Sequence, residues 1–298
     1  MKYVLTGSTG HISKPLAQQL IAAGHQVSII TSNAAKQSEI EALGAKAFVG
    51  NVEDQDFVTT AFAGADALYL MIPPNFAVTN WPAYMHKVAD IYAEAVKANG
   101  IKKVVVLSSM GAHMKHGAGP VDGLAYLEDK VNALSNVDVV SLRPSYFFYN
   151  LLQQVNMIKQ VGIVTSAQPA NHSIILTDSN DIADAAAQNL LNLNFTDKTV
   201  QYIASDDTNT WQDVANALTA AVGKQGVPYV ESTDEQSRAG MQQAGLPATI
   251  VDGYVAMGQA LRSGEMEADY RKHKAEAYMG KVKLADFAKQ FAAAYNAG

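Results

Sequence analysis

The chain has 298 residues, 48% of them hydrophobic and 17% charged, which excludes an intrinsically disordered protein. It carries 22 Lys and Arg residues against 28 Asp and Glu residues, a net charge of −6, and only four of the basic residues are Arg. This balance argues against binding to duplex nucleic acid, whose affinity comes mainly from neutralised phosphates. Cysteine is absent, so a disulfide framework, a thiolate metal site and a cysteine nucleophile are excluded.

The apolar segments are short. None approaches the roughly 18 apolar residues of a membrane-spanning helix, and the apolar run at residues 3–5 is too short for the core of a signal peptide. We therefore expect a soluble cytoplasmic protein, a monomer or homodimer, that binds a small molecule and neither nucleic acid nor a membrane. No spacing of ligand residues predicts a metal site.

Strand and helix patterns alternate through the first half of the chain. Short apolar runs predict buried strands at residues 2–6, 26–31, 47–52, 67–72 and 103–108. Apolar residues at steps of three or four predict helices at residues 12–23, 38–43, 56–62 and 81–95. Strands that are apolar on both faces and alternate with helices are typical of a parallel sheet covered on both sides. The fold class that we predict is α/β, with a Rossmann-type doubly wound parallel sheet.

The pattern is less regular after residue 110. A Gly- and His-rich loop is expected at residues 111–123, and further strands at residues 137–142, 173–177 and 200–204. Thr210 and Asp213 form a capping box that predicts the start of a helix, and the last third is mainly helical. We divide the chain into a dinucleotide-binding domain, residues 1–150, and a smaller C-terminal α/β lobe, residues 151–298. This lobe holds most of the substrate site and is interleaved with the first domain.

A phosphate-binding loop is predicted between the first strand and the first helix. There Gly7 can make the tight turn, Gly10 lets the backbone approach a pyrophosphate, and the start of the helix favours the anion. Ser13 stands at the third glycine position and is small enough for close helix–strand packing. The cofactor-binding residues predicted here are Gly7, Ser8, Thr9, Gly10, His11 and Ile12.

The end of the second strand bears on the choice of cofactor. An acidic residue there would bind the 2′-hydroxyl of NAD, and a basic residue the 2′-phosphate of NADP. The segment contains Ser32, Asn33 and Lys36 and no carboxylate before Lys36. These residues favour NADP over NAD, although Asn33 and Lys36 also fit an ordinary solvated turn.

Several segments together resemble the NmrA-like, atypical short-chain dehydrogenase/reductase family. They are residues 6–12, 50–54, 64–66, 107–109, 142–152 and 181–183, in an order and spacing that cover essentially the whole chain. The resemblance implies an NADP-type cofactor across the carboxyl ends of the strands. It places near the nicotinamide the residues Met71, Ile72, Pro73, Ser108, Ser109, Met110, Pro144 and Tyr146. It also implies that Phe147 and Phe148 line the substrate site, although core packing would explain these aromatic residues as well.

A catalytic pair is harder to assign. Tyr126 and Lys130 are four residues apart, so they share a helix face on which the lysine could lower the phenol pKa. However, Tyr126 lies only 17 residues before Arg143, too close for the long helix that separates a working Tyr–Lys pair from this Arg-Pro strand in relatives. His113, in the Gly-rich loop, is a further candidate for substrate binding or proton donation.

Three functions follow from this reading. The first is NADPH-dependent reduction of a quinone or similar small acceptor, because hydride transfer between stacked rings needs little from the protein beyond orientation. The second is a regulator that senses NAD(P) without catalysis and acts through a protein partner. The third is an epimerase or lyase acting on an activated sugar, which requires the Tyr–Lys pair.

Overall fold

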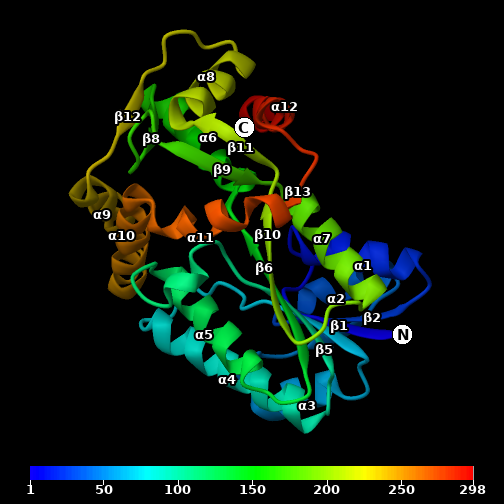
Figure 1. The fold of residues 1–298 in the computed structure, drawn as a ribbon. Coiled ribbons are helices and arrows are strands. Elements are labelled where there is room, and N and C mark those ends of the chain that lie inside the picture. The colour runs from blue at the N-terminus through cyan, green and yellow to red at the C-terminus, as the bar shows by residue number, and fades with distance from the viewer. Residues whose placement is uncertain (298) are drawn as a thin grey trace.

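The computed structural model describes residues 1–297, and its centre is an eight-stranded parallel sheet (Figure 1). In spatial order the strands are β13 (Tyr278–Met279), β10 (Lys198–Ala204), β6 (Asp138–Pro144), β5 (Lys103–Leu107), β4 (Ala67–Leu70), β1 (Lys2–Leu5), β2 (Gln26–Thr31) and β3 (Lys46–Val49). Each neighbouring pair is parallel. The Rossmann-type α/β fold predicted from the sequence is confirmed.

Helices cover both faces of this sheet. One face carries α1 (Ser13–Ala22), α2 (Gln37–Ala42) and α7 (Ser179–Asn192), and the other carries α3 (Gln55–Phe62), α4 (Trp81–Ala98) and α5 (Pro120–Asn132). Each set of helices buries an apolar cluster against the strands. The strands are therefore buried on both faces, which is why their sequences are continuous apolar runs.

The order of the strands changes direction at β1. From β1 the chain proceeds outward through β2 and β3, and then returns to place β4 on the other side of β1. In open α/β sheets such a switch point leaves a crevice outside the carboxyl ends of the strands, where ligands bind. Here the loop after β1 and the segment after β4 meet at that crevice.

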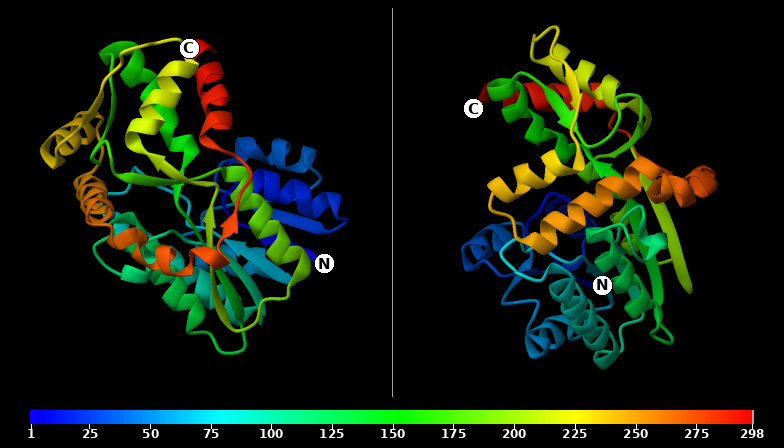
Figure 2. Two further views of the ribbon diagram at one scale, coloured as in Figure 1. Left: turned by 45° about the horizontal axis from the view of Figure 1, so that its top comes forward. Right: turned by 90° about the vertical axis from the view of Figure 1, so that its left-hand side faces the viewer.

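A second lobe stands over the carboxyl ends of the strands. It contains two small sheets, with strand orders β11 (Asp206–Thr210), β9 (Ser173–Thr177), β7 (Tyr146–Phe147), and β12 (Tyr229–Glu231), β8 (Val164–Ser166). Its helices are α6 (Gln154–Asn156), α8 (Trp211–Ala221), α9 (Asp234–Gln243), α10 (Ala248–Ser263), α11 (Glu265–His273) and α12 (Leu284–Ala297). Figure 2 shows α8 and α12 side by side, and they enclose an apolar cluster of their own.

Short helical turns connect these elements. They are η1 (Ala34–Lys36), η2 (Ala112–Met114), η3 (Phe148–Gln153), η4 (Met157–Val161) and η5 (Lys274–Glu276).

The last third of the chain also contributes to the central sheet. Strands β10 and β13 extend it beyond β6, and the buried carboxylate of Asp181 holds the segment after β13 in place. That carboxylate accepts hydrogen bonds from the backbone N–H groups of Lys281 (3.0 Å) and Val282 (3.2 Å) and from the Ser205 hydroxyl (2.6 Å). The two halves of the sequence are thus joined within one sheet.

The expected loop at residues 111–123 ends earlier than predicted. Helix α5 begins at Pro120, because proline suits the first helical position, where its missing N–H needs no partner. Gly119 precedes it with φ +61°, and a Cβ there would lie 1.9 Å from the carbonyl oxygen of Gly253 in α10. Gly119 therefore permits the close approach of the start of α5 to α10.

Within residues 1–297, no helix is long and apolar enough to cross a membrane.

Candidate cofactor and substrate site

The loop after β1 has the geometry of a phosphate-binding turn. Gly7 has φ +94° and Ser8 φ +56°, so the backbone turns sharply before α1. The turn is fixed by hydrogen bonds from the Ser8 N–H to the Ile30 carbonyl (3.0 Å) and from the Ser13 hydroxyl to the Thr6 carbonyl (2.9 Å). In the described chain no side chain caps α1 at Ile12. The Lys14 N–H donates to the Gly10 carbonyl (3.1 Å) and residue 15 is proline, so the N–H groups of Ile12 and Ser13 are the ones at this helix start that stay available to an anion.

The two glycines of the loop have different roles. A Cβ on Gly7 would lie 2.7 Å from the Ser13 hydroxyl oxygen and 2.8 Å from the Met71 sulfur, so Gly7 is required by the packing of the protein itself. A Cβ on Gly10 would meet a single atom within 4 Å, the Gly7 carbonyl oxygen at 3.1 Å. The protein leaves space over Gly10, as a cradle for a pyrophosphate requires.

The carboxyl end of β2 carries the residues predicted to contact the ribose. Ser32 and Asn33 are exposed there, and the Asn33 side chain accepts a hydrogen bond from the Ala35 N–H (3.0 Å) as the cap of η1. The Thr31 hydroxyl receives a hydrogen bond from the Ser8 hydroxyl (2.9 Å), which joins this strand end to the phosphate loop.

A carboxylate that the sequence reasoning missed lies beside these residues. Glu39 forms ion pairs with Lys36 (2.8 Å) and Lys14 (2.9 Å), and the hydroxyl of Thr9 in the phosphate loop donates to it (3.1 Å). The hydrogen bonds from Lys36 and Lys14 lower the pKa of Glu39 to about 2. Glu39 is therefore ionised at every working pH and partly neutralises the two lysines.

The segment after β4 is held across the switch point. The Thr6 hydroxyl accepts from the Met71 N–H (2.6 Å) and donates to the Met71 carbonyl (2.9 Å). From α4, the Tyr92 hydroxyl donates to the Met71 carbonyl (3.1 Å) and the Tyr84 hydroxyl to the Pro73 carbonyl (2.7 Å). These bonds fix the backbone of residues 71–73 at the carboxyl end of β4, beside the phosphate loop.

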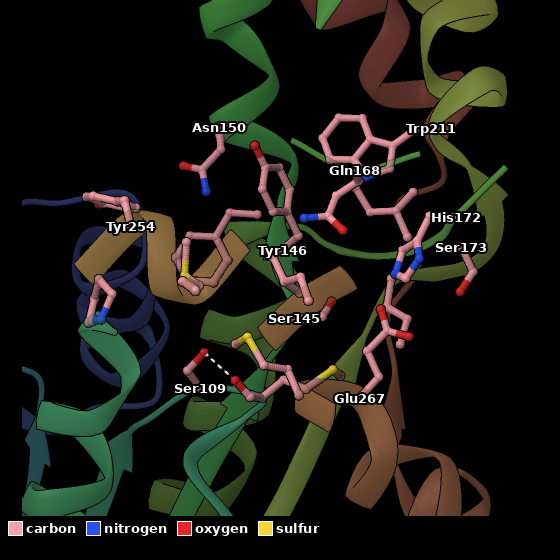
Figure 3. A pocket seen from close by; sticks show the side chains of 18 residues that line it. Ser109, Ser145, Tyr146, Asn150, Gln168, His172, Ser173, Trp211, Tyr254 and Glu267 are labelled. Atoms are coloured by element: carbon pink, nitrogen blue, oxygen red, sulfur yellow. Dashed lines mark hydrogen bonds between the residues drawn. The ribbon is translucent and has the colours of Figure 1, made fainter. Parts of the chain in front are cut away.

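The segments after β5 and β6 lie next to one another. The Ser108 N–H donates to the Leu142 carbonyl and the Met110 N–H to the Pro144 carbonyl, both at 2.8 Å. Beyond them is a pocket of about 220 Å³ (Figure 3). Four of the residues predicted near the cofactor or the substrate line this pocket: Ser109, Met110, Tyr146 and Phe147.

The opposite wall of the pocket comes from the second lobe, and sequence reasoning did not assign it. It is formed mainly by Gln168, His172, Trp211, Tyr254, Met257 and Glu267. Trp211 packs edge-on against Tyr146, with ring centroids 5.6 Å apart. Burial raises the pKa of Tyr146, so its phenol stays protonated. Most of the wall is apolar or aromatic, as is usual for sites that bind small organic molecules.

Two residues expected to line the substrate site, Phe148 and His113, do not line this pocket. Phe148 is fully buried and stacks on Phe287 of α12, with ring centroids 5.1 Å apart, in the apolar cluster of the second lobe. It does not line the pocket, because the chain turns into η3 at this residue and directs the ring inward. His113 lies in η2, also outside the pocket lining.

Tyr126 and Lys130 share a helix face as predicted, but that face meets α4. The Tyr126 hydroxyl donates to Asp90 (3.1 Å), Lys130 forms an ion pair with the same carboxylate (2.7 Å), and the Tyr126 ring stacks on His86. Tyr126 lines a different pocket, of about 620 Å³, which contains none of the residues of the phosphate loop. This larger pocket lies between α4, α5 and α10.

No group of three or more His, Asp or Glu side chains in residues 1–297 is arranged to hold a metal ion.

The phosphate loop and the segments around it fit a bound dinucleotide. The open space over Gly10, the N–H groups of Ile12 and Ser13 at the start of α1 and the switch point between β1 and β4 define a dinucleotide-binding Rossmann protein. The ring of Tyr149, at the edge of the second lobe, packs on His11 of the phosphate loop with centroids 4.0 Å apart. The second lobe thus reaches the loop as well as the pocket.

Comparisons with known proteins agree with this class. The model of a family described as NAD(P)H-binding matches residues 7–193. An NAD(P)H azoreductase of Xenophilus azovorans is 25% identical over 252 residues, which are 84% of this chain and 83% of the relative. The chain belongs to the NAD(P)H-binding family, and the resemblance to NmrA-like short-chain dehydrogenase/reductases is confirmed. This places it among NAD(P)H-binding proteins with a Rossmann-like fold.

Solved structures share the fold over nearly the full length. The NADPH-dependent quinone oxidoreductase of Escherichia coli, complexed with NADPH, has a TM-score of 0.82 and 22% identity, with 97% of this chain and 99% of that chain covered. The triphenylmethane reductase of Citrobacter sp., complexed with NADP(H), has a TM-score of 0.80 and 20% identity, with 98% and 100% covered. At these identities the likeness establishes the fold.

Proposed function

We propose that the protein uses NADPH to reduce a planar aromatic acceptor such as a quinone. The observation that carries the proposal is the apolar, aromatic pocket beyond the carboxyl ends of β5 and β6, where the resemblance places the nicotinamide. Its volume of about 220 Å³ suits one or two fused rings. The names of the relatives, an azoreductase, a quinone oxidoreductase and a triphenylmethane reductase, point in the same direction.

The protein's contribution to this reaction is mainly orientation. When bound, the dinucleotide supplies a hydride. The loop around Gly10 and the start of α1 hold its pyrophosphate, and the backbone of residues 71–73 and 108–110 flanks the nicotinamide. Tyr146 and Trp211 would hold the acceptor ring against that face and exclude water. Fixing two rings in reactive contact removes much of the entropic barrier.

The proposal is tested by mixing the purified protein with NADPH and a panel of benzoquinones and naphthoquinones and following the loss of NADPH absorbance. We expect turnover with at least one naphthoquinone. NADPH binding in calorimetry without turnover of any member of the panel would contradict the reductase. That result would favour a regulator that senses NAD(P) without catalysis. The orientation of Tyr126 away from the pocket is compatible with such a regulator as well. The same orientation argues against an epimerase, because that reaction needs the Tyr–Lys pair at the nicotinamide.

Tyr126→Phe tests the position of the proton donor. We expect the loss of kcat to stay under about tenfold, whereas a positioned general acid contributes about 10²–10⁴-fold. The reason is that the Tyr126 hydroxyl is bonded to Asp90 on α4 and lines a separate pocket. Steady-state kinetics with the best quinone measures the effect. A thousandfold loss in a folded variant would restore Tyr126 and Lys130 as the catalytic pair.

The preference for NADPH over NADH rests on Lys36 and Lys14 at the ribose end of the site. Their charges favour a 2′-phosphate, and Glu39 opposes it by occupying both ammonium groups. We therefore propose a modest preference for NADPH, with Ser32 and Asn33 as further ribose contacts. A clear preference for NADH in competition titrations would contradict it.

Glu39→Gln should strengthen this preference. Removing the carboxylate frees Lys14 and Lys36, so the ratio of NADPH to NADH affinity should rise about fivefold, the scale of a single exposed ion pair. Calorimetric titrations of both cofactors measure the ratio. Glu41→Gln is the matched control, because Glu41 lies on the same helix and is bonded by Gln37 instead. An equal change in both variants would exclude a specific role for Glu39.

A further inference from the structure

Helix α10 is fixed to α4 and α5 at its first turns. A Cβ on Gly119 would lie 1.9 Å from the Gly253 carbonyl oxygen, so the start of α5 stands directly against α10. The Thr249 hydroxyl of α10 accepts a hydrogen bond from the Trp81 N–H at the start of α4 (3.2 Å). Tyr254, the residue after Gly253, therefore has a backbone that is held from two sides.

Tyr254 brings an unpaired hydroxyl group to the pocket beyond β5 and β6. Its ring packs on the Trp81 ring with centroids 5.8 Å apart, and the residue lines the pocket. Its hydroxyl forms no hydrogen bond within residues 1–297 but is not sealed from solvent, unlike the Nε2 of His172. Burial raises the pKa of Tyr254, so the phenol keeps its proton at neutral pH.

Several other polar groups of the lining are committed within the protein or have no proton to transfer. The Ser109 hydroxyl donates to the Met110 carbonyl (2.9 Å). The buried carboxylate of Glu267 is paired with Arg271, so it is held as an ion. The indole N–H of Trp211 can donate a hydrogen bond to a ligand, but an indole does not give up its proton in water.

Tyr146 and His172 are the remaining titratable side chains of the lining. The Tyr146 hydroxyl accepts a hydrogen bond from the amide of Gln153, an exposed residue of η3 in the second lobe (3.3 Å). In the view of Figure 3, His172 lies near Glu267, across the pocket from Tyr254. Tyr254 instead packs on the first residue of α4, which follows the segment after β4 where the nicotinamide is expected.

We propose, building on the reductase function above, that Tyr254 is the proton donor of the reaction and bonds a carbonyl oxygen of the quinone. The quinone gains a hydride from NADPH, which leaves NADP⁺, and becomes a hydroquinone anion with its charge on that oxygen. The O–H bond of Tyr254 breaks as a new O–H bond forms on the product. The Tyr254 phenolate then regains a proton from water. A hydrogen-bond donor aimed at developing charge stabilises the transition state.

Tyr254→Phe removes the hydroxyl and keeps the ring on Trp81. Because this hydroxyl has no partner in residues 1–297, its loss should cost the fold little. We expect kcat with the best naphthoquinone to fall about 100-fold or more while KM stays within about threefold. Single-turnover measurements of NADPH oxidation should show the same loss, and urea unfolding checks the fold.

Buffer acid should replace the missing proton donor. At constant pH and ionic strength, the rate of Tyr254→Phe should rise with the concentration of imidazole buffer, whereas the wild-type rate should not. A phenol that only packs the pocket would give no such rescue. Tyr295→Phe is the matched control, because Tyr295 lies on α12 and lines neither pocket. It should keep the wild-type kcat.

Each outcome decides the assignment. A loss of kcat under about fivefold in folded Tyr254→Phe, a loss without rescue by imidazole, or the large loss in His172→Gln instead would overturn the role of Tyr254 while leaving the reductase intact. If Tyr254→Phe does not fold, the wild type decides: a rate that rises with imidazole concentration would show that no protein group supplies the proton. A protein that binds NADPH but reduces no quinone would instead refute the proposed function.

Discussion

Gly10→Val is expected to abolish dinucleotide binding while the protein stays folded. The valine side chain would fill the space that the loop keeps open for the pyrophosphate, and the backbone N–H groups of the helix start would no longer reach the anion. We expect NADPH affinity to fall at least about 100-fold, or about 2.7 kcal/mol. Calorimetry measures binding and urea unfolding measures stability.

The stability of this variant is the sharper part of the prediction. A Cβ at Gly10 meets the Gly7 carbonyl oxygen alone within 4 Å, at 3.1 Å, so this carbonyl must shift slightly and the cost to folding should stay below about 2 kcal/mol. Gly240→Val is the matched control, because a Cβ there meets nothing within 4 Å and the residue lies on α9. It should leave binding unchanged. Wild-type NADPH affinity in Gly10→Val would show that this loop does not hold the pyrophosphate.

Arg143→Met is expected to destabilise the fold by about 3–5 kcal/mol, the usual cost of removing one partner of a buried ion pair. Arg143 forms two hydrogen bonds to Glu128 of α5, at 2.6 and 3.0 Å, and both residues are under 10% exposed. Burial lowers the pKa of Arg143, but the bonds and charge of Glu128 outweigh this and raise it above its usual value. Losing Arg143 leaves the Glu128 carboxylate buried without its counter-charge.

Urea unfolding of the single and double variants measures this effect. Arg143→Met with Glu128→Leu should regain most of the lost free energy of unfolding, because the buried Glu128 charge is removed with its partner. Asp269, the other carboxylate beside Arg143 (3.7 Å), is 25% exposed and keeps its hydrogen bond from Tyr202. Lys97→Met breaks an exposed ion pair with Glu94 and serves as the control, with no measurable loss. If Arg143→Met unfolds like the wild type, the pair does not contribute to the stability of the α5–β6 contact.

Much of the fold could be predicted from the sequence because the central sheet follows local patterns. The strands at residues 26–31 and 173–177 coincide with β2 and β9, since each is a compact apolar run with distinct ends. The third strand was predicted too long: β3 ends at Val49, where the Gly50 N–H bonds the Thr31 carbonyl and the chain begins to turn. Val52 is buried in the turn that follows, and its apolar side chain alone does not distinguish it from a residue of the strand.

The candidate site was predictable on the cofactor side and not on the substrate side. The phosphate loop depends on residues adjacent in sequence, so its motif is visible. Gln168 and His172 line the same pocket as Tyr146, on segments that are distant in the sequence. The pairing of β7 with β9 in the small sheet brings these segments together, and it leaves no local signal in the sequence. The sequence also does not distinguish Tyr146 from Phe148, which are only two residues apart. Because the chain turns into η3 between them, the Tyr146 ring faces the pocket and the Phe148 ring packs on Phe287.

The entry of β10 and β13 into the central sheet has a consequence for how the chain folds during synthesis. When β6 is complete, its outer edge has no partner until β10 emerges about 50 residues later, and β13 follows much later still. At about 5–20 residues per second, β6 spends roughly 3–10 seconds as an apolar strand with an open edge. Such edges pair readily with other chains. The nascent protein is thus most exposed to aggregation, and most dependent on chaperones, during the interval between Pro144 and Lys198.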